Sequence, residues 1–175
     1  MLSEQRAAEI RRKARQLVTR YSTADPIRLA DRHLGIIVDY NEHPHLLGFS
    51  GRMLDQPYIG LNSNADEDTL RSVCAHELGH ILLGHADSER LRVVRGTELA
   101  DMESELEAEA NCFAASLLLD DDETLEAIDR FQQIPQVAAQ LCVRPELLIA
   151  ELKLLRMRGY AVTVPDRSEI ARWEI

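Results

Sequence analysis

Apolar residues in the first 34 positions recur at the spacing of an α-helix. They fall three or four residues apart at Ala7, Ile10, Ala14, Leu17, Val18 and Tyr21. This spacing predicts one amphipathic helix. Asp25 followed by Pro26 is typical of an N-cap with proline in the first helical position, and Gly35 is a stop signal. Residues 1–34 are therefore predicted to form two N-terminal helices.

Between residues 36 and 62 the helical spacing gives way to short runs of β-branched and apolar residues, separated by turn residues. The candidate strands are residues 36–40, 47–54 and 58–62. We expect a small antiparallel sheet of about three strands.

Helical spacing returns at Asp66 and dominates the rest of the chain. The predicted helices are residues 66–84, 104–119, 123–131, 135–141 and 145–157, and a last short strand is expected at 161–164. Strands first and helices after them predict an α+β domain in which the sheet packs on a helical half. We divide this single domain, residues 1–175, into N-terminal helices (1–34), strands (36–62), two central helices (66–119) and C-terminal helices (120–160).

The composition of the chain indicates the cellular compartment in which the protein is found. With 45% hydrophobic and 29% charged residues, the 175-residue chain is an ordinary globular mixture of single-domain size. No apolar run approaches the ~18 residues that span a bilayer, and residues 1–20 lack the apolar core of a signal peptide. Cys74, Cys112 and Cys142 are an odd number without a C-x-x-C pair, which fits a reducing compartment. We expect a cytoplasmic protein that is neither secreted nor embedded in a membrane.

The charge is acidic and unevenly distributed. The chain carries 20 Lys and Arg against 30 Asp and Glu, a formal net charge of −10, so direct binding to nucleic acid is not expected. Residues 96–129 hold twelve acidic side chains and no basic one, and most of these carboxylates are expected to be solvated. The stretch 134–160 resembles a helix-turn-helix but lacks basic residues where the second helix would meet bases. This favours a hairpin for packing or for docking a partner.

His76-Glu77-Leu78-Gly79-His80 spells H-E-x-x-H inside the predicted helix 66–84. Histidines four residues apart lie one turn above each other, so both imidazoles reach one ion. The glutamate lies about 100° round the helix, beside a water that the metal activates. Two nitrogens and a carboxylate suit zinc with an open fourth position. We predict that His76 and His80 bind one Zn²⁺ per chain and that Glu77 is the general base; the alternative is a pair of surface histidines.

The third protein ligand has more than one candidate. His85 misses the spacing of the metzincin motif by one position, and is more simply a polar residue after a helix end. On the helix 104–119, Glu107 lies closer to the buried face than Glu105 or Glu109, since each residue turns the helix by about 100°. Ser104 and Glu107 also match a capping box, in which the glutamate only returns to the helix start. Geometry favours Glu107 and leaves the alternatives open.

Three stretches resemble the ImmA/IrrE family of metallopeptidases: H-E-L-G-H-I-L-L-G-H at 76–85, E-A-E-A-N-C-F-A-A-S-L-L-L at 107–119 and Y-I-G-L-N at 58–62. The resemblance covers about residues 33–160. It implies that Glu107 is the third ligand, so that two histidines and a glutamate form a gluzincin-like ligand set. It also places Asn111 one turn after Glu107, where its side chain can orient a ligand. At residues 120–122 three aspartates stand where many relatives have a proline, which leaves the exit of the second helix open.

The resemblance further implies a function. It indicates a zinc-dependent endopeptidase that makes a limited, site-specific cut in a repressor-type transcription regulator with a helix-turn-helix. The alternative is a non-catalytic zinc module that binds a regulatory partner, including a toxin-antitoxin-like partner. Glu77 favours the enzyme, because a purely structural zinc needs no base and closes its fourth position.

Further expectations concern the substrate. The strand 58–62 is expected at the sheet edge, where it holds an extended substrate through its main chain; its residues are Tyr58, Ile59, Gly60, Leu61 and Asn62. The acidic stretch 98–109 and the C-terminal hairpin are expected to dock a folded, basic partner. The alternatives are a paired inner strand and an acidic stretch that only keeps the protein soluble. Tyr58, His85 and Tyr160 are candidates for the donor that stabilises the transition state.

Overall fold

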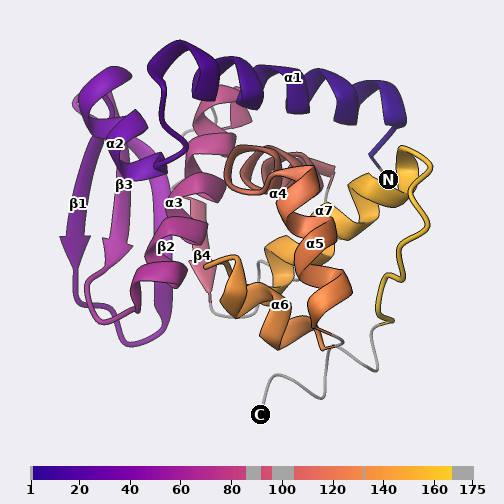
Figure 1. The fold of residues 1–175 in the computed structure, drawn as a ribbon. Helices are drawn as coiled ribbons and strands as arrows, with labels where there is room; N and C mark the ends of the chain where they lie inside the picture. The colour runs from indigo at the N-terminus through magenta and orange to yellow at the C-terminus, as the bar shows by residue number, and fades with distance from the viewer. Residues whose placement is uncertain (1, 86–91, 96–104, 132, 167–175) are drawn as a thin grey trace.

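Figure 1 shows a fold in which one long helix separates a small sheet from a group of helices. The computed structural model describes residues 2–85, 92–95, 105–131 and 133–166. α3 (Glu67–Leu82) packs on the sheet and on α4 (Glu105–Leu118), while α1 (Glu4–Tyr21) crosses over α4. The predicted α+β class is confirmed.

The N-terminal helices form where their local signals predict. Ser3 caps α1 through a hydrogen bond from the main-chain nitrogen of Arg6. Asp25 caps α2 (Pro26–Arg28), which continues into a π-helical turn, η1 (Leu29–His33). Gly35 then takes a left-handed conformation with φ of +65°, which a residue without a Cβ adopts at little cost.

The sheet has four described strands in the order β1-β3-β2-β4. They are β1 (Ile37–Asn41), β2 (Leu46–Met53), β3 (Gln56–Asn62) and β4 (Arg92–Arg95). β2 is antiparallel to both β3 and β4, but β1 is parallel to β3, so the expected all-antiparallel pairing is wrong. The β2–β3 hairpin places β3 between β1 and β2, and hydrophobic patterns carry no information about strand direction.

β3 is an inner strand, so the expected substrate-binding edge at Tyr58, Ile59, Gly60, Leu61 and Asn62 is also wrong. Residues 58–62 pair with β1 on one side and 58–61 pair with β2 on the other. Their main-chain hydrogen-bonding groups are therefore used within the sheet. Among the described strands, β1 and β4 are the edges.

The C-terminal half consists of four described helices that follow the predicted order. They are α4, α5 (Asp121–Arg130), α6 (Ile134–Gln140) and α7 (Pro145–Met157). Asp120 caps α5 by accepting a hydrogen bond from the main-chain nitrogen of Asp122, which explains an aspartate directly after α4. The strand expected at 161–164 is absent: these residues have no strand partner, and Val162 and Val164 pack on the core instead.

The largest fully buried side chains come from the helices around α3 and from β3. They include Phe113, Leu78, Leu117, Leu147, Leu148, Leu152, Ile59 and Leu61. This packing holds α3 rigidly between the two halves of the fold, which is a requirement for a site that needs fixed geometry. Within the described ranges, no helix combines the length and apolar character needed to cross a membrane.

Candidate metal centre

Two imidazoles and one carboxylate meet between α3 and α4. The Nε2 atoms of His76 and His80 lie 3.0 Å apart. Oε2 of Glu107 lies 3.2 Å from Nε2 of His76 and 3.3 Å from Nε2 of His80. Ligand atoms bound at 2.0–2.1 Å to a tetrahedral zinc are about 3.3 Å apart. The donor triangle therefore has the size of one face of a zinc tetrahedron.

Gly79 allows α4 to come close enough for this contact. A Cβ at position 79 would lie 3.1 Å from the carbonyl oxygen of Ala110 and 3.2 Å from the Cβ of Phe113. These distances are shorter than ordinary van der Waals contact, so any larger residue would push the two helices apart. The close approach lets Glu107 reach both imidazoles across the helix interface.

Glu107 is held in its ionised form. Burial raises the pKa of its carboxyl, but hydrogen bonds from the imidazoles of His76 and His80 outweigh burial and lower the pKa well below its ordinary value. A metal ligand must be deprotonated, so this state suits coordination. Ser104, the partner in the alternative capping box, lies outside the described residues; the Glu107 carboxylate is directed at the imidazoles.

Each histidine also has a partner on the far edge of its ring. Nδ1 of His76 lies 2.9 Å from Oδ1 of the fully buried Asn111. Nδ1 of His80 lies 3.0 Å from Nδ1 of His85. Partners at Nδ1 fix the ring orientation and keep the Nε2 lone pair directed at a metal. The structure thus places Asn111 beside the His76 imidazole.

Glu77 is fully buried on α3 between the two histidines. Burial lowers the pKa of the His76 imidazole, but the hydrogen bond with Glu107 and the negative charges of Glu77 and Glu107 outweigh it, so the pKa is raised. The charge of Glu77 is therefore felt at the donor triangle. Its carboxylate is not a member of that triangle.

The three candidates for a transition-state donor are engaged in other contacts. The Tyr58 hydroxyl donates to Asp39 on β1, 3.2 Å away. Tyr160 lies under the guanidinium of Arg158, beyond the end of α7. His85 contacts the outer edge of the His80 ring and is not among the three converging donors, so its placement does not support the third-ligand alternative.

The described part of the acidic stretch 98–109 is not a continuous solvated surface. Residues 98–104 lie outside the described part of the chain. Of the rest, Glu105 is exposed, but Glu107 faces the histidines and Glu109 is buried against Arg6 and His85. Glu107 and Glu109 therefore make their contacts inside the protein. The expectation that this stretch docks a partner is wrong for these two residues.

Sequence reasoning missed the contacts of Glu109, His85 and Arg6. Oε2 of Glu109 lies 3.1 Å from Nε2 of His85, and Arg6 donates to both carboxylate oxygens over 2.9 Å and 2.6 Å. The estimate from helical angle placed Glu109 away from the buried face of α4. That estimate did not take account of α1, which covers that side of the helix. Arg6 is 103 positions from Glu109, and no local pattern connects them.

A second group of charges surrounds the buried Glu151 on α7, and we name Arg11, Asp121, Glu151 and Arg158 the Glu151 cluster. Glu151 is fully buried, with Nη2 of Arg158 at 2.8 Å and Nη1 of Arg11 at 3.6 Å. Asp121 accepts hydrogen bonds from Arg11, at 2.7 Å, and from Arg158. Burial raises the pKa of Glu151 to about 7, although both guanidiniums oppose this shift.

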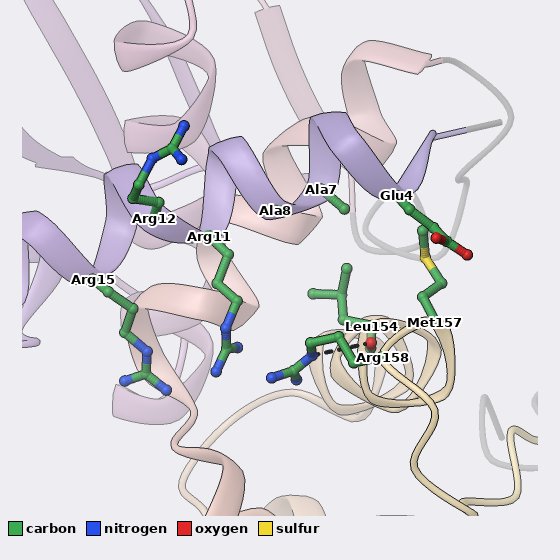
Figure 2. Close-up of a pocket in the computed structure, with 9 residues that line it drawn as sticks. All are labelled: Glu4, Ala7, Ala8, Arg11, Arg12, Arg15, Leu154, Met157 and Arg158. Atoms are coloured by element: carbon green, nitrogen blue, oxygen red, sulfur yellow. Dashed lines mark hydrogen bonds between the residues drawn. The ribbon is translucent and has the colours of Figure 1, made fainter.

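The arginines of this region border a pocket of about 440 Å³. Figure 2 shows Arg11, Arg15 and Arg158 reaching into the space between α1 and α7. Leu154 and Met157 supply apolar lining from α7. None of the three donors of the metal centre lines this pocket, so the pocket and the donor triangle are separate features.

A helix with two buried histidines and a glutamate, joined by a carboxylate from a second helix, is the arrangement of metal-dependent peptidases. The sequence model of the Peptidase_M78 family, described as the IrrE N-terminal-like domain, matches residues 37–153. The chain belongs to this family. It is also similar to uncharacterized immunity region protein 2 of Bacillus phage phi105. The two are 32% identical over 112 residues, which cover 64% of this chain and 69% of the phage protein.

Proposed function

We propose that the protein is a cytoplasmic zinc-dependent endopeptidase with a gluzincin-like ligand set. The observation that carries this proposal is the convergence of three buried or half-buried donors on one point, with Glu77 on the same helix. Membership of a peptidase family supports it. Structural zinc sites close all four positions with protein ligands, whereas three protein donors leave one position for reactants.

The side chains divide into two roles. His76, His80 and Glu107 hold the ion, while Oδ1 of Asn111 orients His76 by accepting a hydrogen bond from its Nδ1–H. When bound, zinc supplies the Lewis acid that peptide hydrolysis requires. Glu77 takes a proton from the attacking water and delivers it to the nitrogen of the leaving amine. Glu77 is fully buried on the helix that carries both histidines, which suits a group held beside the reacting water.

The proposed substrate is a helix-turn-helix repressor, cut at one or two peptide bonds. The resemblance to the ImmA/IrrE family motivates this choice, and the phage relative is named for an immunity region. The inner position of β3 removes the main-chain edge first expected to hold substrate. Selection must then rest on contacts with a folded partner rather than on a long, general binding strand.

The test compares wild type with Glu77→Gln, and uses Glu67→Gln as a matched control on the exposed first turn of α3. A purified helix-turn-helix repressor and casein serve as substrates. We expect about one zinc per chain in all three proteins, and cleavage of the repressor by wild type and Glu67→Gln only. Loss of one general base lowers the rate by about 10²–10⁴-fold.

Two results would contradict the proposal. Rapid digestion of casein at many sites would indicate a general protease. A zinc-loaded wild type that does not cut the repressor, together with a Glu77→Gln variant that keeps the regulatory effect, would favour a non-catalytic zinc module.

A further inference from the structure

We propose that His85, Glu109 and Arg6 form a chain of positioning residues that orients the metal ligand His80. The chain starts at Nδ1 of His80, passes through both ring nitrogens of His85 and the Glu109 carboxylate, and ends at the Arg6 guanidinium. This inference rests on the metal site of the proposed function. It adds three residues to that site, one of which comes from α1.

When a metal is bound at Nε2 of His80, the protons along the chain can be assigned in only one order. His80 must keep the lone pair of Nε2 for the metal, so its Nδ1 carries the proton and donates to His85. Nδ1 of His85 then accepts, which leaves its proton on Nε2, where it donates to Glu109 over 3.1 Å. Glu109 is acceptor-only when ionised, and Arg6 is donor-only. Every contact therefore pairs one donor with one acceptor.

The Arg6 contact fixes the far end of the chain. Nε and Nη2 of Arg6 donate to the two different oxygens of Glu109, at 2.9 Å and 2.6 Å. Such a bidentate, charge-assisted pair holds the carboxylate plane in one orientation. Because Arg6 only donates, both oxygens of Glu109 act as acceptors in this pair, and Oε2 also lies 3.1 Å from Nε2 of His85.

Burial gives these contacts their strength. His85 and Glu109 are each 8% exposed, and His80 is 1% exposed. Hydrogen bonds are electrostatically stronger away from water, and a broken bond in such a place leaves a buried polar group unpaired. A rotation of the His80 ring would break its contact with His85, so the chain resists that rotation.

The two metal-binding histidines are thus positioned by different parts of the protein. Asn111 holds His76 from α4, within the segment matched by the family model. The chain from His80 ends in α1, which lies outside the matched residues 37–153. α1 packs on α4, so its docking brings Arg6 to Glu109. Correct docking of α1 is therefore a condition for a well-oriented His80.

The experiment measures zinc affinity by competition with a chromophoric chelator, and the visible spectrum of the cobalt-substituted protein. His85→Phe keeps an aromatic ring but removes both ring nitrogens. His85→Gln restores an acceptor for His80 and a donor for Glu109. Arg6→Ala removes the far end of the chain, and Arg12→Ala is its control on an exposed position of α1.

We expect His85→Phe to lower zinc affinity about 10–100-fold, the usual effect of removing a partner of a metal-binding histidine. His85→Gln should recover most of this loss. Arg6→Ala should lower the affinity several-fold and shift the cobalt absorption bands, and Arg12→Ala should change neither. Thermal unfolding of each metal-free variant separates these effects from loss of the fold.

Two outcomes would overturn the inference, and they are distinguishable. If wild type binds zinc and both His85→Phe and Arg6→Ala bind it equally well, the chain does not position His80 and the metal site stands. If wild type binds neither zinc nor cobalt, the metal site itself is wrong and the inference falls with it. Should His85→Phe fail to fold, Arg6→Ala decides the question, because Arg6 lies at a half-buried position.

Discussion

The metal centre and the Glu151 cluster are both groups of charge in the helical half with a fully buried member, and each contains a carboxylate with a shifted pKa. At the metal centre the hydrogen bonds of two imidazoles lower the pKa of Glu107. In the Glu151 cluster, burial raises the pKa of Glu151 to about 7. Burial and a perturbed pKa would therefore mark both places as candidate sites.

The direction of the polar atoms separates the two. At the metal centre the Nε2 atoms of His76 and His80 and the Oε2 atom of Glu107 converge, and all three can act as donor atoms to one ion. In the Glu151 cluster, the two carboxylates face two guanidiniums, which have no lone pair to offer. The donor atoms of the metal centre can therefore bind an added cation. In the Glu151 cluster the guanidiniums already supply the positive charge. Convergence of acceptors is thus a better guide to a metal site than buried charge.

The largest expected effect is a loss of zinc affinity at the metal centre. Glu107→Ala should lower zinc affinity by more than the ~100-fold that bounds the loss of an outer partner, because a direct ligand is removed. The metal-free protein should lose about 1–3 kcal/mol of unfolding free energy, because two buried imidazoles lose a hydrogen-bond partner. Chelator competition and denaturant unfolding measure the two quantities, and Glu105→Ala, at an exposed position of α4, is the control. Undiminished zinc in Glu107→Ala would refute its role as a ligand.

Arg158→Met tests the opposite side of the comparison. It leaves the buried Glu151 with only the more distant Arg11, and removing one partner of a buried pair should cost about 3 kcal/mol of unfolding free energy. Zinc affinity should stay within about twofold. Adding Glu151→Leu should restore most of the stability, and Arg156→Met, an exposed position of α7, should have little effect. A parallel loss of zinc affinity would mean that the two regions are coupled.

Gly79→Ala should affect both stability and metal binding. The added Cβ must displace the main chain of Ala110, which should cost about 2–3 kcal/mol as an overpacked core. The displacement also moves Glu107 away from the imidazoles, so zinc affinity should fall. Gly35→Ala is the control: it strains a left-handed residue with open space around it, and should lower stability alone. A stable Gly79→Ala variant with normal zinc affinity would show that the helices adjust freely.

The smallest effect is a pH dependence. The carboxyl of Glu151 has a pKa of about 7 in the folded protein, against 4.5 for an ordinary glutamate. As the pH rises, the unfolded chain therefore loses the Glu151 proton before the folded protein does. Glu151 therefore makes the free energy of unfolding fall by at most about 2 kcal/mol between pH 5 and 7. Glu151→Gln should remove this slope in metal-free protein, whereas the exposed Glu126→Gln should keep it. Identical slopes in wild type and Glu151→Gln would exclude Glu151 as its cause.

Local sequence patterns were sufficient for the parts of the molecule that local forces determine. Asp25, Asp66 and Gly35 begin or end elements as predicted, because caps and left-handed turns depend on a few neighbouring residues. The spacing of His76 and His80 could be converted directly into a shared helix face. The resemblance then singled out Glu107, for which helical angle alone had left alternatives.

The patterns failed where distant segments meet. Apolar runs located β1 and β3 but could not show that they pair in parallel, or that β3 is an inner strand. Val162 and Val164 have strand propensity, yet no described strand pairs with them, so they pack on helices. The contact of Arg6 with Glu109 depends on how α1 docks, and a single sequence does not record that docking.

Gly79 changes how the five-residue motif should be understood by anyone who wishes to transplant it. The notation H-E-x-x-H treats the third and fourth positions as free, yet here the fourth position sets the spacing between two helices. A protein engineer who copies only the two histidines and the glutamate onto another helix pair would reproduce the imidazoles without bringing a carboxylate within reach. For this scaffold the transferable unit is H-E-x-G-H together with a partner helix that presents the main chain of Ala110 and the Cβ of Phe113 to the glycine.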